Sequence, residues 1–99
     1  IRASVPAPGF TCLHYWPFVE VDGGSNRMCR GATPGDIKSV YYTWYGSSAV
    51  PSAESCQDLC ISEPSCRGIE FSSSGCKVWT RVGGIETSVY AADYVCSRY

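Results

Sequence analysis

Residues 55–79 read SCQDLCISEPSCRGIEFSSSGCKVW, and this one segment contains four of the seven cysteines of a 99-residue chain. Cys56 and Cys60 are four positions apart, and Leu59 falls on the same side of a helix drawn through them. Residues at this spacing are typical of a helix that presents one stripe to a partner. We therefore expect a helix over residues 53–62 whose cysteine-bearing stripe faces a sheet.

Local signals mark both ends of this helix and predict a hairpin after it. Ser52 occupies the N-cap position, and Glu54 places a negative charge in the first turn, where the helix dipole favours it. Pro64 prevents continuation because it lacks an amide hydrogen. Residues 67–71 and 76–81 have strand composition on either side of a serine-rich turn that ends in glycine.

Three further segments have the composition of strands. Residues 15–21 are aromatic and β-branched, and Pro17 favours an edge position because it cannot donate to a neighbouring strand. The Asp-Gly-Gly sequence at 22–24 predicts a turn that ends this strand. Residues 37–45 and 89–96 are also rich in β-branched and aromatic residues. The whole pattern predicts an α+β fold, with one helix packed on an antiparallel sheet.

Length and composition limit what the chain can be. A chain of 99 residues forms one small domain, whose core offsets the entropy of folding with little margin. Seven cysteines therefore predict disulfide staples and a secreted or extracellular location. A net charge of −1 offers no basic field for nucleic acid, and no apolar run is long enough to span a membrane. We expect residues 1–14, which contain two prolines, to form an extended arm or inter-repeat linker, and 15–99 to form the domain.

The segments 55–60, 66–71 and 75–79 together resemble the PAN/Apple family. In that family a Cys-x-x-x-Cys helix is followed by a Cys-x-Gly strand and then by a cysteine in a hairpin. With Cys29 and Cys96 included, the likeness extends over roughly residues 15–99. The resemblance implies a small, disulfide-stapled fold in which an antiparallel sheet cradles one α-helix.

The resemblance also implies a pairing for six of the cysteines. Spacing alone leaves many connectivities open for six cysteines. The family pattern ties the helix to the hairpin with two central bridges and joins the terminal strands with an outer one. The implied pairs are Cys29 with Cys96, Cys56 with Cys76, and Cys60 with Cys66. Cys12 is left over, as a free thiol or as the origin of a bond to another copy.

The two ends of the chain carry a short repeat. Residues 10–15 and 94–99 both read aromatic-x-Cys-x-x-Tyr, with a histidine or arginine before the last tyrosine. A unit taken from a tandem array would show such a match at its ends. Cys12 would then occupy the place that Cys96 occupies in the preceding unit.

No catalytic or metal-binding constellation stands out. The four clustered cysteines are enough for a zinc site, but they lack paired Cys-x-x-Cys knuckles, so disulfides are the better interpretation. The single histidine, His14, is two positions from Cys12, which is a weak basis for Cys–His catalysis. Residues 22–26 have too few carboxylates for a calcium loop. We expect no enzymatic activity, no metal and no cofactor.

Aromatic and basic side chains predict a recognition surface. Thirteen Phe, Trp and Tyr residues exceed what a core of this size easily hides. The predicted strand at 76–81 places the indole of Trp79 between Lys77 and Arg81 on one face, near Arg67. Residues 37–45 supply a second aromatic patch. The alternatives are that the indole covers the helix and that the second patch is one side of a core. The six candidate ligand-binding residues are Trp79, Lys77, Arg81, Arg67, Tyr42 and Trp44.

Two functions follow from these features. The first is a non-enzymatic extracellular binding or adhesion module that recognises a glycan or an extracellular protein through its aromatic and basic surface. The alternative is a self-assembling structural subunit of an extracellular fibre or array. In that case the arm at residues 1–14 and Cys12 would link one copy to the next.

Overall fold

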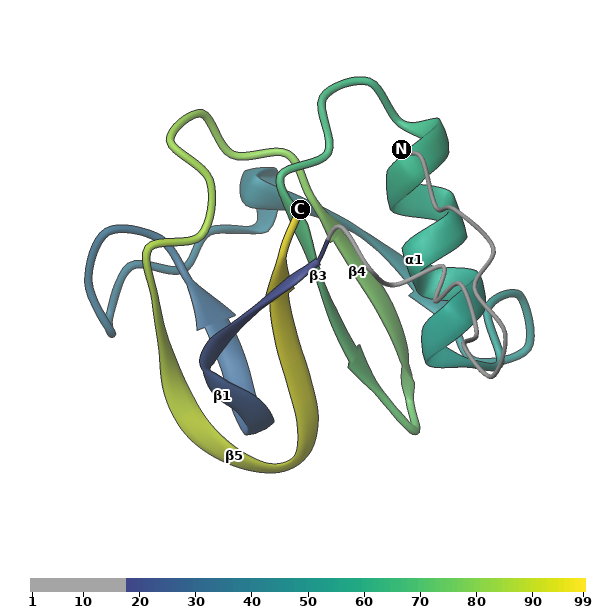
Figure 1. Ribbon diagram of the computed structural model, residues 1–99, viewed down its shortest axis with the longest axis horizontal. Helices are drawn as coiled ribbons and strands as arrows, with labels where there is room; N and C mark the ends of the chain where they lie inside the picture. Colours follow the sequence, from purple (N-terminus) through teal and green to yellow (C-terminus); the bar gives the residue numbers. More distant parts are fainter. Residues whose placement is uncertain (1–17) are drawn as a thin grey trace, which may run out of the picture.

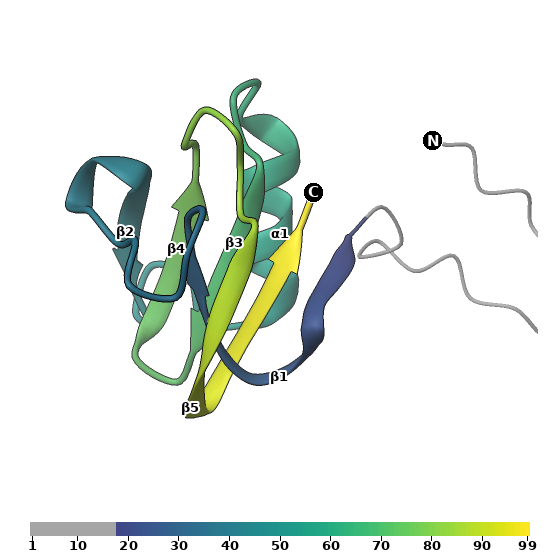
Figure 2. The ribbon, with the colours of Figure 1, turned by 90° about the vertical axis from the view of Figure 1, so that its left-hand side faces the viewer.

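The computed structural model describes residues 18–99, which form a five-stranded antiparallel sheet with one helix on one face (Figures 1 and 2). The strand order is β1-β5-β3-β4-β2, so β1 and β2 are the two edges. The elements in chain order are β1 (Val19–Arg30), the 3₁₀ turn η1 (Ser39–Tyr41), β2 (Tyr42–Gly46), α1 (Ala53–Ser62), β3 (Gly68–Ser72), β4 (Gly75–Trp79) and β5 (Thr87–Arg98). This architecture confirms the predicted α+β fold.

The helix α1 has the predicted bounds, Ala53–Ser62, because its first turn is capped from both sides. The Ser52 hydroxyl accepts from the Ser55 amide at 3.1 Å, and the Ser55 hydroxyl accepts from the Ser52 amide at 3.1 Å. This reciprocal capping box satisfies two amide groups that the first turn would leave unpaired. At the other end the amide of Glu63 donates to the carbonyl of Cys60 at 3.0 Å.

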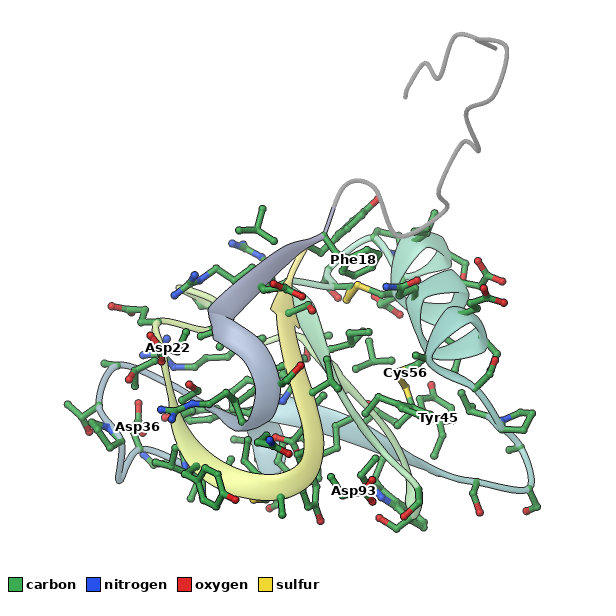
Figure 3. The ribbon with its side chains drawn as sticks, turned by 60° about the horizontal axis from the view of Figure 1, so that its bottom comes forward. Phe18, Asp22, Asp36, Tyr45, Cys56 and Asp93 are labelled. Atoms are coloured by element: carbon green, nitrogen blue, oxygen red, sulfur yellow. A yellow bond between two sulfur atoms is a disulfide. The ribbon has the colours of Figure 1, made fainter. Side chains whose placement is uncertain are left out.

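The core between α1 and the sheet is built largely from sulfur. Cys56 of α1 is bonded to Cys76 of β4, and Cys60 is bonded to Cys66 ahead of β3. Figure 3 shows Cys56 and Tyr45 in the space between the helix and the sheet. The buried members of this cluster are Val50, Cys56, Cys60, Cys66, Ile69, Cys76 and Val78. Two covalent bonds therefore hold the helix against the sheet, because the apolar stripe of the helix provides few large side chains for packing.

A second core lies on the opposite face of the sheet. The long strands β1 and β5 pair with each other and curve away from β3 and β4 (Figure 1). The third disulfide joins Cys29 of β1 to Cys96 of β5 inside this region. The buried residues of this cluster are Val21, Cys29, Trp79, Ile85 and Cys96. The three disulfides are the pairs that the family resemblance implied.

Gly68, the glycine of the Cys-x-Gly motif, is required by close packing in this second core. A Cβ atom at this position would collide with the Ile85 side chain and with the carbonyl oxygen of Ser97. The absence of a side chain therefore lets β5 and the loop before it approach β3 closely.

The predicted turn at 22–24 is wrong. Residues 22–24 lie inside β1, which continues to Arg30 while its register against β5 shifts between Glu20 and Arg27. The φ angles of Asp22, Gly23 and Gly24 are positive, at 52°, 86° and 81°. Glycine-rich sequence therefore produces a bulge that curves the strand, and pairing resumes after it.

The predicted strand over 37–45 is shorter in the structure. A single 3₁₀ turn, Ser39–Tyr41, precedes β2, which begins at Tyr42. The hairpin of β3 and β4 has the expected position, and its first strand ends at Ser72. β5 extends the expected 89–96 strand at both ends.

Several predictions fall on residues that the structure does not describe. The arm at 1–14, Cys12, His14, Pro17 and the 10–15 half of the repeat all lie outside residues 18–99. Within the described range, no helix is long and apolar enough to cross a membrane.

The disulfides should contribute unequally to stability. Replacing both Cys29 and Cys96 with alanine should lower the free energy of unfolding by about 4 kcal/mol, because this bridge has a sequence separation of 67. The same change at Cys60 and Cys66, with a separation of 6, should cost about 2 kcal/mol. Urea denaturation monitored by tryptophan fluorescence measures both. Equal costs, or the reverse order, would contradict the loop-entropy explanation.

Candidate functional site

An aromatic surface lies on the sheet face opposite α1. Trp44 of β2 is paired with Lys77 of β4, and Lys77 is paired in turn with Glu70 of β3. These three side chains therefore form one row across three strands, and Tyr42 lies two residues from Trp44 on the same face. Trp44 is 55% exposed. We call Trp44, Tyr42 and Lys77 the Trp44 surface.

Within this surface, Lys77 is held in place by two neighbours. Its ammonium nitrogen lies 3.2 Å from Oε2 of Glu70 and 4.6 Å from the centre of the Tyr42 ring. The Glu70 side chain is 1% exposed and that of Lys77 is 20% exposed. The other carboxylate oxygen of Glu70 accepts from the amide of Cys29 at 2.7 Å. The charge of Lys77 is therefore balanced by Glu70, and a ligand at the Trp44 surface meets the exposed Trp44 ring and no unpaired cation.

Trp79 does not belong to the accessible surface. It is fully buried, with 0% exposure. The centre of its ring lies 5.8 Å from the ring centre of Tyr41 and 5.7 Å from that of Tyr42. The expectation that Trp79 presents its ring to a ligand is therefore wrong. The alternative that it covers the helix is also wrong, because it lies in the cluster on the other face of the sheet. Trp79 instead supports Tyr42 from beneath.

Arg81 is also engaged within the protein. β4 ends at Trp79, so Arg81 does not continue the alternation of that strand. Its guanidinium lies 3.5 Å from the Asp36 carboxylate and 3.3 Å from that of Glu86, and donates to the carbonyl of Gly84 at 2.9 Å. Arg81 therefore fastens two loops together, which corrects its prediction as a ligand-binding residue beside Trp79.

The Asp36 carboxylate, which pairs with Arg81, also accepts two hydrogen bonds. One carboxylate oxygen accepts from the Ala32 amide at 2.8 Å, and the other accepts from the Tyr41 hydroxyl at 2.7 Å. The Ala32 amide, followed by the Tyr41 hydroxyl, lowers the pKa of Asp36 below its ordinary value. Figure 3 shows Asp36 in its loop, on the side of the molecule away from α1.

Arg67 lies apart from the Trp44 surface. Its amide donates to the carbonyl of Trp79 at 2.6 Å, and its carbonyl accepts from the amide of Tyr99 at 2.9 Å. Its side chain lines a separate pocket together with Arg98 and Tyr99. The structure therefore brings together Trp44, Tyr42 and Lys77 and leaves Arg67 elsewhere.

Arg98 was not among the predicted site residues. The only sequence signal for it is the basic residue before the last tyrosine in the terminal repeat. That signal indicates an array, and only the fold shows that Arg98 and Arg67 line one pocket.

A family model described as the PAN domain matches residues 38–99. The chain belongs to the PAN domain family. The match covers every element from η1 to β5 and both disulfides of the helix-side core, and the structure adds β1 to the sheet. No curated protein and no solved structure matches the chain.

Family membership gives the general class of function. PAN domains are modules that bind proteins or carbohydrates in extracellular proteins, and they are generally non-enzymatic. Within residues 18–99, no group of three or more His, Cys, Asp or Glu residues is arranged to hold a metal ion.

The pair formed by Glu70 and Lys77 should respond asymmetrically to mutation. Lys77→Met should lower the free energy of unfolding by about 3 kcal/mol, because it leaves the buried Glu70 carboxylate without a cation. Glu70→Gln should cost about 1–2 kcal/mol, because the amide keeps an acceptor for Cys29 and Lys77 can turn toward water.

Urea denaturation of both variants tests this difference. The double variant Lys77→Met/Glu70→Gln serves as the control, since it removes both charges and should be more stable than Lys77→Met alone. A Lys77→Met variant as stable as the parent would show that Glu70 does not depend on this cation.

Proposed function

We propose that this PAN domain is a non-enzymatic extracellular binding module that holds a glycan or a protein ligand against the Trp44 surface. The observation that carries the proposal is the contrast between two tryptophans on one sheet face. Trp79 is completely buried, whereas Trp44 is 55% exposed. Desolvating a large exposed ring by a ligand yields favourable free energy, and Trp is enriched where partners bind most tightly.

The surroundings of Trp44 favour stacking over charge recognition. Its ring extends along β2 toward Gly46, where an added Cβ would lie 3.2 Å from the indole. Lys77 is neutralised by Glu70, and the Tyr42 ring rests on buried Trp79. An exposed aromatic ring without an unpaired charge beside it suits the apolar face of a sugar ring or an aliphatic or aromatic side chain.

Secretion is part of this proposal. Six of the seven cysteines form disulfides, and all six are buried or nearly so. Disulfides of this density persist in oxidising compartments such as the cell exterior.

Removing the Trp44 ring should weaken binding without unfolding the domain. We expect Trp44→Ala to bind its strongest ligand at least tenfold more weakly, which corresponds to about 1.4 kcal/mol. The measurement is binding to an immobilised panel of neutral and acidic oligosaccharides and purified extracellular-matrix proteins.

Tyr90→Ala is the matched control, because Tyr90 is another exposed aromatic residue, at 71%, and lies on β5. This variant should bind as the parent does. A Trp44→Ala variant with unchanged affinity, or equal losses in both variants, would contradict a role specific to the Trp44 surface.

Self-assembly is a second candidate function, which the cysteine count favours. Three disulfides use six of the seven cysteines, and Cys12 is the one left over. The strands β1 and β2 are also at the edges of the sheet, where a strand from another copy could pair. The structural-subunit function would join copies through residues 1–14 and Cys12.

Assembly through Cys12 predicts covalent multimers. Under oxidising conditions the parent chain should form a dimer that disappears on reduction, and Cys12→Ser should remain a monomer. Non-reducing electrophoresis and light scattering measure this. A parent chain that stays monomeric when oxidised would exclude the covalent link.

A further inference from the structure

A concave site separate from the Trp44 surface lies at the C-terminal end of β5, beside the loop that joins β4 to β5. Figure 1 shows this loop and the C-terminal end of β5. Its volume of about 460 Å³ is within the usual range for small-molecule pockets. We call it the Arg67 pocket. Its lining residues are Arg67, Gly83, Gly84, Ile85, Glu86, Arg98 and Tyr99.

Arg98 is fixed in the wall of this pocket. Its guanidinium donates to the backbone carbonyls of Ile85 and Glu86, at 2.5 Å and 3.1 Å. Both acceptors are uncharged, so the positive charge of Arg98 keeps no carboxylate partner among residues 18–99. An arginine held in place by carbonyls loses little side-chain entropy when it binds an anion.

Arg67 supplies a second guanidinium. Its side chain is exposed, and within the described part of the chain it makes no hydrogen bond or ion pair. The one side-chain carboxylate in the lining, that of Glu86, lies 3.3 Å from the guanidinium of Arg81. The lining therefore contributes the positive charges of Arg67 and Arg98, while Glu86 is already paired with Arg81.

Tyr99 is the aromatic residue of the lining. It is 46% exposed, and its ring packs against that of Phe18, with the ring centres 5.0 Å apart. Gly83 and Gly84, both with positive φ, lie in the loop that borders the pocket and add no side chains to it. The lining of the pocket thus combines two arginines with a partly exposed tyrosine.

We propose that the Arg67 pocket binds an acidic saccharide. Arg67 and Arg98 would hold the carboxylate or sulfate group, and Tyr99 would stack against the sugar ring that carries it. This inference rests on the glycan branch of the proposed function and assigns the acidic group to a site separate from the Trp44 surface. The neutralised Lys77 makes the Trp44 surface unsuited to that role.

The test is an NMR titration of the parent chain with four probes: D-glucuronate, glucose 6-sulfate, glucose and inorganic sulfate. The Nε–Hε signal of Arg67, the Nη signals of Arg98 and the amide of Tyr99 should shift and saturate with the two acidic sugars. Glucose should cause no saturable shift, and inorganic sulfate should bind at least fivefold more weakly than glucose 6-sulfate.

Variants separate the charge from the ring. Arg67→Gln should weaken binding of glucuronate at least tenfold, whereas Lys38→Gln, which removes an exposed positive charge outside the pocket, should leave it unchanged. Tyr99→Ala should weaken the acidic sugars but leave inorganic sulfate unaffected.

Several results would overturn the proposal. Equal shifts with glucose and glucuronate, or full affinity in Arg67→Gln, would exclude an acidic-group site. Equal affinity for sulfate and glucose 6-sulfate would exclude the sugar ring, and an aspartate-rich peptide that binds more tightly than either sugar would assign the pocket to proteins.

A failure of this pocket proposal can be distinguished from a failure of the proposed function. Trp44→Ala should leave the NMR titration unchanged, because Trp44 does not line the pocket. Loss of panel binding in Trp44→Ala without any response at Arg67 would retain the Trp44 surface and exclude this pocket.

Discussion

Covalent sulfur bonds take the place of a large apolar interior in this PAN domain. Both core clusters are small, and cystine sulfurs make up much of each one. The Cys56–Cys76 and Cys60–Cys66 bridges fix α1 to one face of the sheet, while Cys29–Cys96 holds the β1–β5 ribbon on the other. Because these bonds replace packing by large side chains, aromatic residues such as Trp44 are left for the surface.

The second core also determines the electrostatic character of the Trp44 surface. Glu70 is buried where β1 passes over the sheet, and its carboxylate binds the Cys29 amide and the Lys77 ammonium. The Trp44 surface is consequently aromatic and electrically balanced. The Arg67 pocket lies beyond this network, and among residues 18–99 the Arg98 guanidinium is bound only by backbone carbonyls. One small sheet thus offers a stacking surface and a cationic pocket.

Much of the helix and hairpin could be predicted because their signals are local. The Ser52 cap and the Pro64 stop mark the ends of α1, and the serine-glycine turn marks the hairpin. The Asp-Gly-Gly sequence at 22–24 does not distinguish a turn from a bulge. The same sequence forms a chain reversal or a bulge, depending on whether a partner strand continues alongside. The site was predicted only in part. Alternation placed Lys77 and Trp79 on one face correctly, but it carries no information about what covers that face.

The amino-acid sequence is sufficient to predict the helix, the hairpin and, through its cysteine pattern, the family to which the chain belongs. These features depend on residues close together in the chain, where caps, turns and spacing act directly. The folded chain was needed to show that Trp79 is buried while Trp44 is exposed, and that Arg67 and Arg98 line one pocket. Exposure and proximity depend on how the β1–β5 ribbon curves across the sheet, and that curvature results from contacts between residues far apart in the sequence.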